Sequence, residues 1–422
     1  MRDRRRLAVI GLQFGDEGKG KIVDYVLNNY GHFDSVFRYN GGANAGHTII
    51  RGSRRYALHI VPSGILFPHL YKGILEKVVF DPLRLASEIK SLIENGISLH
   101  HGNLGISSRC NVTVDYHYNI ESHDEEQRGA KKIDTTKKGI GPTYSDRAVH
   151  KGIRFGEFLD KDLFEELFME NVQRLREESG ISVESDLPEK YAESRDFLKD
   201  FVVDEGELMR RRRDGRILYE GAQGVLLDVG YGTQPFSTSS SIVNKPHKVD
   251  ENIGVMKAYI TRVGKGPLIT RMDPKSEAAV RGNKPAGLNM DGSEYGTTTG
   301  RPRDCGWPDL FAARYAVNVG DIDSIVITKL DRLAMPDISI CTGYKYRGSA
   351  LSHFPENRRV LENSEPIYTT IVGWSKDGVS KAREWSELPQ AAKDFILCVE
   401  GFIERPVNMI SVGSSEEETI HR

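Results

Sequence analysis

Short apolar runs alternate with helical stretches along this chain, and the pattern is clearest near its start. The apolar run Leu7–Leu12 ends in a glycine-rich turn, after which Ile22, Val23, Val26 and Leu27 recur at helical spacing. This order predicts a strand, a loop and a helix. In such a unit the N–H groups of the loop and of the first helical turn face a bound anion.

Further apolar runs predict more strands, with helical stretches between several of them. Ser35–Tyr39 leads directly into a second glycine-rich loop, so that two such loops can face one ligand from two sides. The alternation favours an α/β fold: a large, mostly parallel central β-sheet flanked by helices, with a phosphate-loop-like nucleotide site. The later strand candidates are Ile217–Tyr219, Ala258–Val263, Ser324–Thr328 and Ile338–Tyr344.

Two charged, amphipathic stretches, Leu163–Glu178 and Glu193–Arg213, predict a helical insertion at about residues 155–215. We find no internal repeat and no low-complexity linker in the sequence. A single elaborated α/β domain over residues 1–422 is therefore expected, rather than a string of modules.

Composition and charge narrow the class of protein. Hydrophobic residues make up 38% of the chain and charged residues 28%, which is typical of a soluble globular protein. The net charge of −2 gives no general attraction to nucleic acid or to acidic membranes. No apolar run approaches the ~18–20 residues of a membrane span. Scattered cysteines without a C-x-x-C pair argue against structural zinc and disulfides, and predict a cytoplasmic location. They are Cys110, Cys305, Cys341 and Cys398.

The segment GDEGKGKI (15–22) begins like the phosphate-binding motif G-x-x-x-x-G-K. However, Ile22 stands where that motif has the Ser or Thr that binds Mg²⁺. A glycine-rich turn can also simply reverse the chain. Glycines that allow close approach of the backbone and lysines that add charge, placed between a strand and a helix, favour phosphate binding instead. The glycines are Gly15, Gly18 and Gly20, and the lysines are Lys19 and Lys21.

The tetrapeptide TKLD, Thr328–Asp331, directly follows an apolar strand. A carboxylate at a strand end can accept from both N1–H and the 2-amino group of guanine, a donor pair that adenine lacks. Asp331 therefore favours GTP over ATP. The alternative for Asp331 is a helix N-cap.

The segment GTTTGRPRDCGW, Gly296–Trp307, combines threonines and arginines in one glycine-containing loop. Arg301 and Arg303 offer rigid donor forks for a small carboxylate, and the hydroxyls fill its remaining acceptor sites. A solvated Gly/Thr turn remains the alternative for the threonines.

Together and in this order, these segments resemble adenylosuccinate synthetase over nearly the full length of the chain. The resemblance implies a GTP-dependent ligase that joins IMP and L-aspartate into adenylosuccinate, with release of GDP and phosphate. It implies a 6-phosphoryl-IMP intermediate, a Mg²⁺ cofactor, and a homodimer whose active sites are completed across the interface. This reaction is the first committed step from IMP to AMP. Matching segments include GDEGKGKIVD (15–24), NGGANAGHT (40–48), DTTKKGIGPTYSD (134–146), EGAQGVLLD (220–228), GTQPFSTSS (232–240) and TTTGRPRDCGW (297–307).

The resemblance also implies roles for individual residues. Asp16 would be the base that removes the N1 proton of IMP, and His47 the acid that stabilises the transferring phosphoryl group. The implied catalytic residues are Asp16, His47, Lys19 and Gln223, and the metal ligands are Asp16 and Gly46. The implied GTP-binding residues are Gly15, Asp16, Glu17, Gly18, Lys19, Gly20, Lys21, Gly46, His47, Thr48, Arg303, Lys329, Leu330, Asp331, Ser411, Val412 and Gly413. IMP would contact Asp16, Lys19, Asn44, Ala45, Gly46, His47, Thr136, His150, Gln223, Thr238 and Arg301. Aspartate would contact Thr297, Thr298, Thr299, Gly300, Arg301 and Arg303.

Some positions depart from the family pattern. His150 stands where an arginine usually reaches the IMP phosphate in the neighbouring subunit, and histidine carries less charge at neutral pH. Asp304 stands where a basic or neutral residue is usual, which predicts weaker binding of a dicarboxylate. The segment Leu268–Met272 replaces a usual Pro-Thr-Glu.

Two alternatives stay open at this point. One is a paralogue with the same chemistry on another purine nucleotide or amine. Relatives that act on 2-amino purines are expected to lack the loop carboxylate, so Asp16 argues against that variant. The other is a non-catalytic GTP-binding switch module, which leaves His47 and the Thr/Arg loop unexplained and needs a hydroxyl where Ile22 stands.

Overall fold

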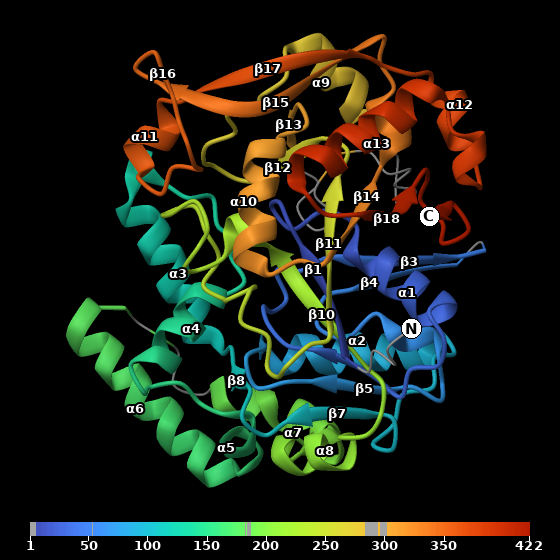
Figure 1. Cartoon of the computed structure of the whole chain (residues 1–422). Helices are drawn as coiled ribbons and strands as arrows, with labels where there is room; N and C mark the ends of the chain where they lie inside the picture. Colours follow the sequence, from blue (N-terminus) through green and yellow to red (C-terminus); the bar gives the residue numbers. More distant parts are fainter. Residues whose placement is uncertain (1–5, 53, 182, 184–186, 283–293, 296–301) are drawn as a thin grey trace.

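A ten-stranded sheet runs through the centre of the molecule (Figure 1). The computed structural model describes residues 6–52, 54–181, 183, 187–282, 294–295 and 302–422. Neighbouring strands of this sheet are parallel, except for β18 and β19. The predicted mostly parallel α/β sheet is thereby confirmed. In spatial order the strands are β19 (Thr419–His421), β18 (Val407–Ser411), β14 (Ser324–Thr328), β11 (Glu251–Lys257), β1 (Arg6–Gly11), β10 (Ile217–Gly224), β2 (Ser35–Arg38), β5 (Tyr71–Ile74), β7 (Leu104–Ser107) and β9 (Val202–Val203).

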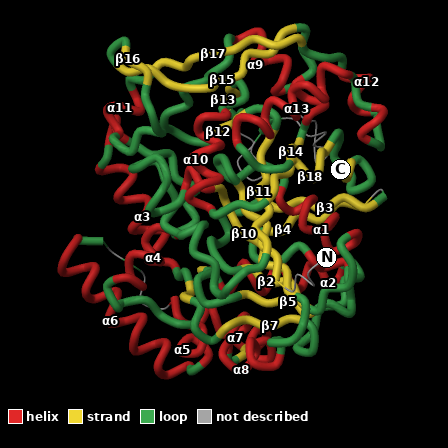
Figure 2. Tube along the Cα trace, in the orientation of Figure 1, coloured by secondary structure: helices red, strands yellow, loops and turns green. Residues whose placement is uncertain are grey.

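Helices surround this sheet, and smaller pairs of strands lie in the segments that connect its strands (Figure 2). The helices are α1 (Lys19–Asn29), α2 (Pro82–Glu94), α3 (Asp115–Gln127), α4 (Ile140–Ala148), α5 (Phe155–Leu159), α6 (Lys161–Ser179), α7 (Ala192–Leu198), α8 (Glu205–Arg211), α9 (Pro274–Arg281), α10 (Leu310–Gly320), α11 (Arg358–Glu362), α12 (Lys376–Ser380) and α13 (Gln390–Ile403). The small antiparallel pairs are β3 (His47–Arg51) with β4 (Arg54–Leu58) and β12 (Ile260–Arg262) with β13 (Asp304–Gly306), and the parallel pair is β6 (Val79–Phe80) with β8 (Asn111–Val112). A three-stranded sheet joins β15 (Asp337–Tyr346) to β16 (Ser349–Ala350) and β17 (Glu365–Val372).

The predicted strand, loop and helix at the start of the chain are β1, residues 12–18 and α1. Helix α1 packs on β1 and β10 through the apolar face that the sequence predicts. Ile22 is fully buried there and belongs to one apolar cluster with Val9 of β1 and Ile253 of β11. The side chain at position 22 therefore supports the helix from its buried face.

One strand prediction needs correction, and another predicted strand lies outside the central sheet. Ala258–Val263 was predicted as one strand, but only Ile260–Arg262 is extended, in the small β12–β13 pair. The neighbouring strand of the central sheet is β11, which the apolar pattern missed because Glu251, Asn252 and Lys257 interrupt it although the whole strand is buried. The predicted strand Ile338–Tyr344 exists, but it lies in the three-stranded sheet, outside the central one.

The predicted helical insertion is interrupted. Leu163–Glu178 lies within α6, as expected, whereas Glu193–Arg213 is divided into α7, β9 and α8. Val202 and Val203 have β-branched side chains that favour an extended backbone, and this backbone pairs with β7 to form β9 at the edge of the sheet. Helices α5 to α8 gather at the end of the molecule opposite the three-stranded sheet (Figure 1). The single-domain organisation stays a prediction.

Replacing Ile22 with alanine is expected to lower the free energy of unfolding by about 2–5 kcal/mol. The truncated side chain leaves a cavity between α1 and the sheet. The matched control is Ile93→Ala on α2, where the side chain is 40% exposed and the loss should stay below about 1 kcal/mol. Urea unfolding followed by circular dichroism measures both. Equal losses in the two variants would contradict the buried role of Ile22.

Candidate active site

The loops that carry the predicted site follow the carboxyl ends of parallel strands, which meet at one edge of the sheet. Residues 12–18 follow β1, residues 39–46 follow β2, Gln223 stands at the end of β10, and Lys329 follows β14. Segments that are far apart in the sequence therefore converge at one place.

The phosphate loop is braced from inside by Glu17. Its fully buried carboxylate accepts from the N–H groups of Gln13 at 3.0 Å and Gly15 at 2.8 Å. The ammonium of Lys19, 2% exposed, donates to Glu17 at 2.8 Å and to the Gly15 carbonyl at 3.2 Å. Gly18 adopts φ 86° directly before α1, a conformation that favours glycine. The side chains of Glu17 and Lys19 thus stabilise the loop, and any contact of Glu17 with a phosphate would come from its backbone.

Asp16 lies against a buried cluster of cations. Its Oδ2 atom accepts from Lys257 Nζ at 2.8 Å and Thr261 Oγ1 at 2.5 Å, and pairs with Arg303 Nε at 3.0 Å. The other oxygen, Oδ1, is buried and has no hydrogen-bond partner among the described residues. Burial raises the pKa of Asp16, but Lys257 and Arg303 outweigh it, so the pKa lies below its usual value. Asp16 is therefore ionised at neutral pH and keeps one oxygen for a ligand.

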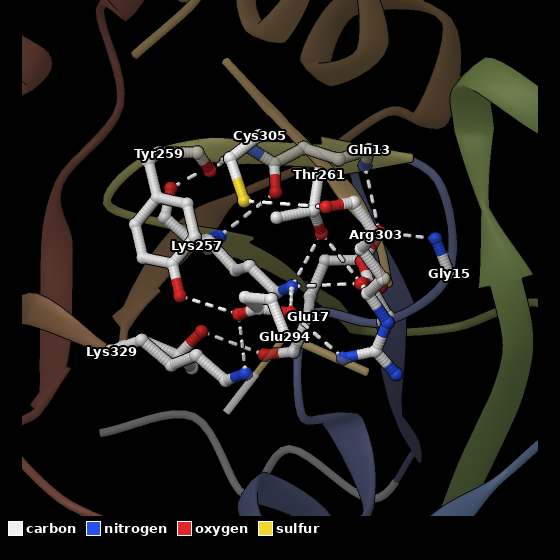
Figure 3. Close-up of polar contacts among 12 residues, drawn as sticks. Gln13, Gly15, Glu17, Lys257, Tyr259, Thr261, Glu294, Arg303, Cys305 and Lys329 are labelled. Carbon is white, nitrogen blue, oxygen red and sulfur yellow. Dashed lines mark hydrogen bonds and ion pairs between the residues drawn. The ribbon is translucent and has the colours of Figure 1, made fainter. Parts of the chain in front are cut away.

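Glu294 forms ion pairs with three cations of this cluster (Figure 3). Its fully buried carboxylate accepts from Lys257 at 2.9 Å, Lys329 at 2.7 Å and Arg303 Nη1 at 2.8 Å, and from the hydroxyl of Tyr259. Burial raises the pKa of Glu294, yet the three cations hold it well below its usual value. Lys257 bridges the two carboxylates, because its ammonium contacts both Asp16 and Glu294.

His47 is oriented by Glu220. Nδ1 of the imidazole hydrogen bonds to the Glu220 carboxylate, which also accepts from the Ser63 hydroxyl at 2.6 Å and the Ser63 N–H at 2.7 Å. Burial raises the pKa of Glu220, but His47 and Ser63 outweigh this effect, so the pKa lies below its usual value. Glu220 therefore stays ionised, and Nδ1 of His47 carries the proton of their hydrogen bond. Nε2 of His47 is buried without a partner among the described residues. Burial lowers the pKa of His47, and Glu220 opposes this effect.

The two glycine-rich loops lie side by side, as they must if they are to face one ligand. A Cβ atom on Gly20 would fall 3.0 Å from Cβ of His47, and one on Gly15 would fall 2.8 Å from Cα of Gln223. On Gly41 it would fall 2.8 Å from Oε1 of Gln223. Gln223 therefore sits between the loops, and larger residues at Gly15 or Gly41 would displace it.

Three predicted IMP ligands are neighbours. Asn44 Oδ1 accepts from Gln223 Nε2 at 2.9 Å, and Asn44 Nδ2 lies 3.5 Å from Thr238 Oγ1. Oε1 of Gln223 is buried without a partner among the described residues. Lys138, which was not predicted, reaches the same loop and donates to the carbonyl of Ala43 at 2.5 Å.

Lys21 points away from the phosphate loop toward the predicted guanine site. Its ammonium donates to Ser411 Oγ at 2.6 Å and to the carbonyls of Gly413 at 2.9 Å and Glu418 at 3.1 Å. Burial lowers the pKa of Lys21 to about 7. Asp331 lies in the first turn of a 3-10 helix, Leu330–Leu333, but Lys329, with φ 56°, holds its N-cap position. The N-cap alternative for Asp331 is therefore wrong.

Other predicted residues lie as follows. Gly46 is exposed between the second loop and β3, and Thr48 belongs to β3. Thr136 and His150 are both exposed, and His150 has φ 62°. The side chains of Leu330 and Val412 are fully buried, so only their backbones are open to a ligand. Ala45 is buried, and its carbonyl accepts from His59 at 2.8 Å. The predicted residues Thr297, Thr298, Thr299, Gly300 and Arg301 lie outside the described residues.

Two departures from the family pattern face each other. Asp304 of β13 forms an ion pair with Arg271 of the segment Leu268–Met272. The negative charge of Asp304 is thus compensated by a neighbour, which weakens the expectation that it repels a dicarboxylate.

The residues that organise the site were not predicted from the sequence. Lys257, Glu294, Glu220 and Ser63 were given no role, although Glu220 lies in one of the quoted segments. A carboxylate after the apolar run Ile217–Tyr219 was a usable signal, because a buried charge needs a partner. Lys257 and Glu294 carried no comparable local signal.

The protein side chains of the site could bind a divalent cation only together with oxygens supplied by a bound substrate. The described part of the chain holds no group of three or more His, Cys, Asp or Glu side chains suited to a metal. Asp16 Oδ1 is a buried, unused acceptor, and Mg²⁺ is commonly bound by one or two carboxylates together with substrate phosphates.

Among the described helices, none has the length and apolar character needed to cross a membrane.

A glycine-rich loop that carries a carboxylate, beside a buried His–Glu pair and a cluster of cations, suits an enzyme that transfers a phosphoryl group from a nucleotide. A family model described as adenylosuccinate synthetase matches residues 8–420. Adenylosuccinate synthetases of Desulforamulus reducens and Moorella thermoacetica are 38% and 40% identical to this chain, over 98% of each chain. The chain therefore belongs to the adenylosuccinate synthetase family.

Solved structures agree with this assignment. The fully ligated adenylosuccinate synthetase from Plasmodium falciparum superposes with a TM-score of 0.90 at 33% identity, covering 99% of this chain and 100% of that one. The succinoaminodeoxyadenylate synthetase of cyanophage S-2L, at 18% identity and a TM-score of 0.59, shares the fold. The family consists of ligases that join IMP and aspartate at the expense of GTP. The predicted enzyme class is thus confirmed, and the switch module is excluded.

Replacing Lys257 with methionine is expected to lower the free energy of unfolding by about 3–5 kcal/mol at pH 7.5, the usual cost of removing one partner from a buried ion pair. The loss should shrink at pH 5. Without Lys257 the pKa values of Asp16 and Glu294 rise, so the folded variant takes up protons at a higher pH than the wild type and is stabilised relative to it.

Denaturant unfolding at the two pH values measures the effect. The matched control is Lys381→Met, whose side chain is 79% exposed and which should cost less than about 1 kcal/mol at either pH. A loss in Lys257→Met that did not depend on pH would contradict the bridging role of Lys257.

Proposed function

We propose that this chain joins IMP and L-aspartate to adenylosuccinate with conversion of GTP to GDP and phosphate, using the residues of the described site. One observation carries the assignment of roles. Asp16 Oδ1, His47 Nε2 and Gln223 Oε1 are buried polar atoms without a partner among the described residues, and they lie on loops that meet. Buried polar atoms are normally hydrogen-bonded, so these three are the acceptors and donors reserved for substrates.

Asp16 acts as the base in the first step. It accepts the N1 proton of the purine, which makes O6 nucleophilic enough to attack the γ-phosphorus of GTP. An O6–phosphorus bond forms, the bond from phosphorus to the β-phosphate oxygen breaks, and GDP leaves. The lowered pKa keeps Asp16 ionised. When Arg303 leaves Asp16 to bind a ligand, the pKa of Asp16 rises and Asp16 becomes a stronger base.

The second step displaces phosphate. The amine of aspartate attacks C6 of the 6-phosphoryl intermediate, the new C–N bond forms, and the C6–O6 bond breaks to release phosphate. We assign Arg303, and the predicted residues of the loop before it, to the carboxylates of aspartate. Arg303 supports this role because its guanidinium is already held at the site by Asp16 and Glu294.

His47 stabilises the phosphoryl group in transfer. Nδ1 is committed to Glu220, so Nε2 faces the ligand and donates when the imidazole is protonated. Burial disfavours the imidazolium, whereas Glu220 and the incoming phosphate oxygens favour it. Proton uptake by His47 is therefore coupled to binding of the nucleotides.

The remaining contacts follow the loops. We assign the phosphates of GTP to residues 15–21 and 46–48, its guanine to residues 329–331 and 411–413, and IMP to Asn44, Gln223, Thr238 and the Thr136 segment. Lys21 supports the guanine assignment, since it ties the phosphate-loop helix to residues 411–418.

Asp16 and the Gly46 carbonyl would hold Mg²⁺ together with phosphate oxygens. The ion would supply charge that neutralises the phosphates of GTP. We further propose a homodimer in which His150 contributes to the neighbouring IMP site, supported by its exposure. A cytoplasmic location is supported by four cysteines that are all free.

Purified protein with GTP, Mg²⁺, IMP and L-aspartate is expected to show the ultraviolet absorbance change of adenylosuccinate formation, and chelation of Mg²⁺ should abolish it. Asp16→Ala should lower the rate at least ~10²-fold, because it removes the general base. Liquid chromatography of the products confirms that GDP and adenylosuccinate form in equal amounts.

Each other outcome changes the assignment. Turnover of another nucleotide or amine, without turnover of IMP and aspartate, would establish the paralogue instead. Near-normal activity of Asp16→Ala would remove Asp16 from the role of base while leaving the reaction in place.

The alkaline limb of the pH–rate profile is expected to move to lower pH in Glu220→Gln. The carboxylate of Glu220 favours the protonated form of His47, and removing its charge lowers the pKa of His47. Ser63→Ala gives the opposite sign, because a carboxylate that loses a hydrogen bond binds the imidazolium more tightly. Initial rates between pH 6 and 9 measure both shifts. A common direction in the two variants would disprove the assignment of this limb to His47.

A further inference from the structure

Two carboxylates on the buried side of α3 hold a loop that the reaction needs. Glu121 and Glu125 stand one helical turn apart and are 6% and 5% exposed. Both point at residues 132–139, the segment between a short 3-10 turn, Gly129–Lys131, and α4. This segment carries Thr136, a predicted IMP ligand.

The contacts are made to backbone N–H groups at both ends of the segment. Glu125 accepts from Ile133 at 3.2 Å through Oε1 and from Asp134 at 3.0 Å through Oε2. Glu121 accepts from Gly139 at 2.6 Å through Oε2. These residues are neither helical nor extended, so the carboxylates replace the partners that a helix or sheet would supply. Hydrogen bonds to ionised acceptors are stronger than those between neutral groups.

The segment needs this support because its backbone is strained. Asp134 and Lys137 have φ values of 61° and 52°, a left-handed region that is unfavourable for most non-glycine residues and least so for Asn and Asp, so the cost is greater at Lys137 than at Asp134. On its other side, a Cβ atom on Gly264 would lie 3.4 Å from the carbonyl oxygen of Asp134. Residues 133–134 are thus enclosed between α3 and the turn at Gly264.

Glu125 is suited to this task as a carboxylate and not as an amide. Burial raises the pKa of Glu125, but the N–H groups of Ile133 and Asp134 and the side chain of Arg128 bring it below its usual value. Its two oxygens accept from different N–H groups. A glutamine would place an NH₂ donor against one of them, so either Ile133 or Asp134 would lose its bond.

The segment is also joined to the second glycine-rich loop. Lys138, 7% exposed, donates to the carbonyl of Ala43 at 2.5 Å, next to Asn44. The side chain of Thr136 stays exposed between the two held ends. A shift of the segment therefore alters both Thr136 and the loop that carries Asn44.

We propose that Glu121 and Glu125 are positioning residues that hold residues 133–139 in the conformation that binds the nucleoside monophosphate substrate. They act through the backbone of the segment and do not contact the ligand. The nature of the ligand rests on the proposed function, whereas the hold on the segment does not.

The kinetic test compares Glu125→Gln with Glu126→Gln, which changes the adjacent, exposed glutamate of the same helix. Loss of a hydrogen bond to a buried charged acceptor predicts a KM for IMP raised at least about tenfold in Glu125→Gln. The KM for GTP should change less than about twofold, and Glu126→Gln should match the wild type. Equal increases in both KM values, or none, would overturn the proposal.

A second measurement reads the segment directly. Lys131, Lys132, Lys137 and Lys138 offer tryptic sites within or next to it. Trypsin should cleave there at least about tenfold faster in Glu125→Gln than in Glu126→Gln, at equal global stability by denaturant unfolding, because opening of the loop becomes easier. Glu121→Gln should give the same result, and unchanged cleavage in both variants would overturn the proposal.

The comparison of KM values depends on the proposed function, because it needs turnover of IMP. The comparison of trypsin cleavage does not depend on it. If the wild type showed no turnover of IMP, the proposed function would fail. Faster cleavage in Glu125→Gln would still support the hold on the segment. If the wild type were active and Glu125→Gln kept both its KM for IMP and its resistance to trypsin, the positioning role would fail alone.

Discussion

The site depends on one buried ammonium group, Lys257, placed between the carboxylates of Asp16 and Glu294. Burial of a charge is costly unless it is paired, so the positions of three distant segments are fixed together by this lysine. Arg303 and Lys329 complete the cluster, which sets three cations against two carboxylates. The remaining positive charge suits a site that receives phosphates and a dicarboxylate.

Local sequence was enough to predict the parts of the site that lie in single segments. The glycine-rich loop and the helix after it were accessible, because spacing and residue type limit what such segments can do. The pairing of Asn44 with Gln223 across 179 residues was not, and only the family resemblance implied a common ligand for them. Lys257 and Glu294 were not, since their chemistry arises from contacts across 241 and 37 residues. Strand β11 was not predicted for a related reason: its polar residues are buried by neighbours that the sequence does not reveal.

The phosphate loop departs from the common nucleotide-binding motif in a coherent way. Ile22 is buried against the sheet, so no hydroxyl at that position could reach a metal. Asp16 supplies a free carboxylate oxygen inside the loop instead, and Glu17 holds the loop open by accepting from its N–H groups. The conformation of the loop is therefore maintained by its own side chains rather than by a bound phosphate.

The bonds from Lys21 to Ser411, Gly413 and Glu418 join positions 390 to 397 residues apart. During translation, the phosphate loop leaves the ribosome long before these acceptors exist. Domains fold largely as units, and contacts of such sequence separation form late. A nascent chain therefore forms the contacts of Lys21 only after β1 to β18 have been synthesised, so the end of α1 that carries Lys21 stays without these partners until then.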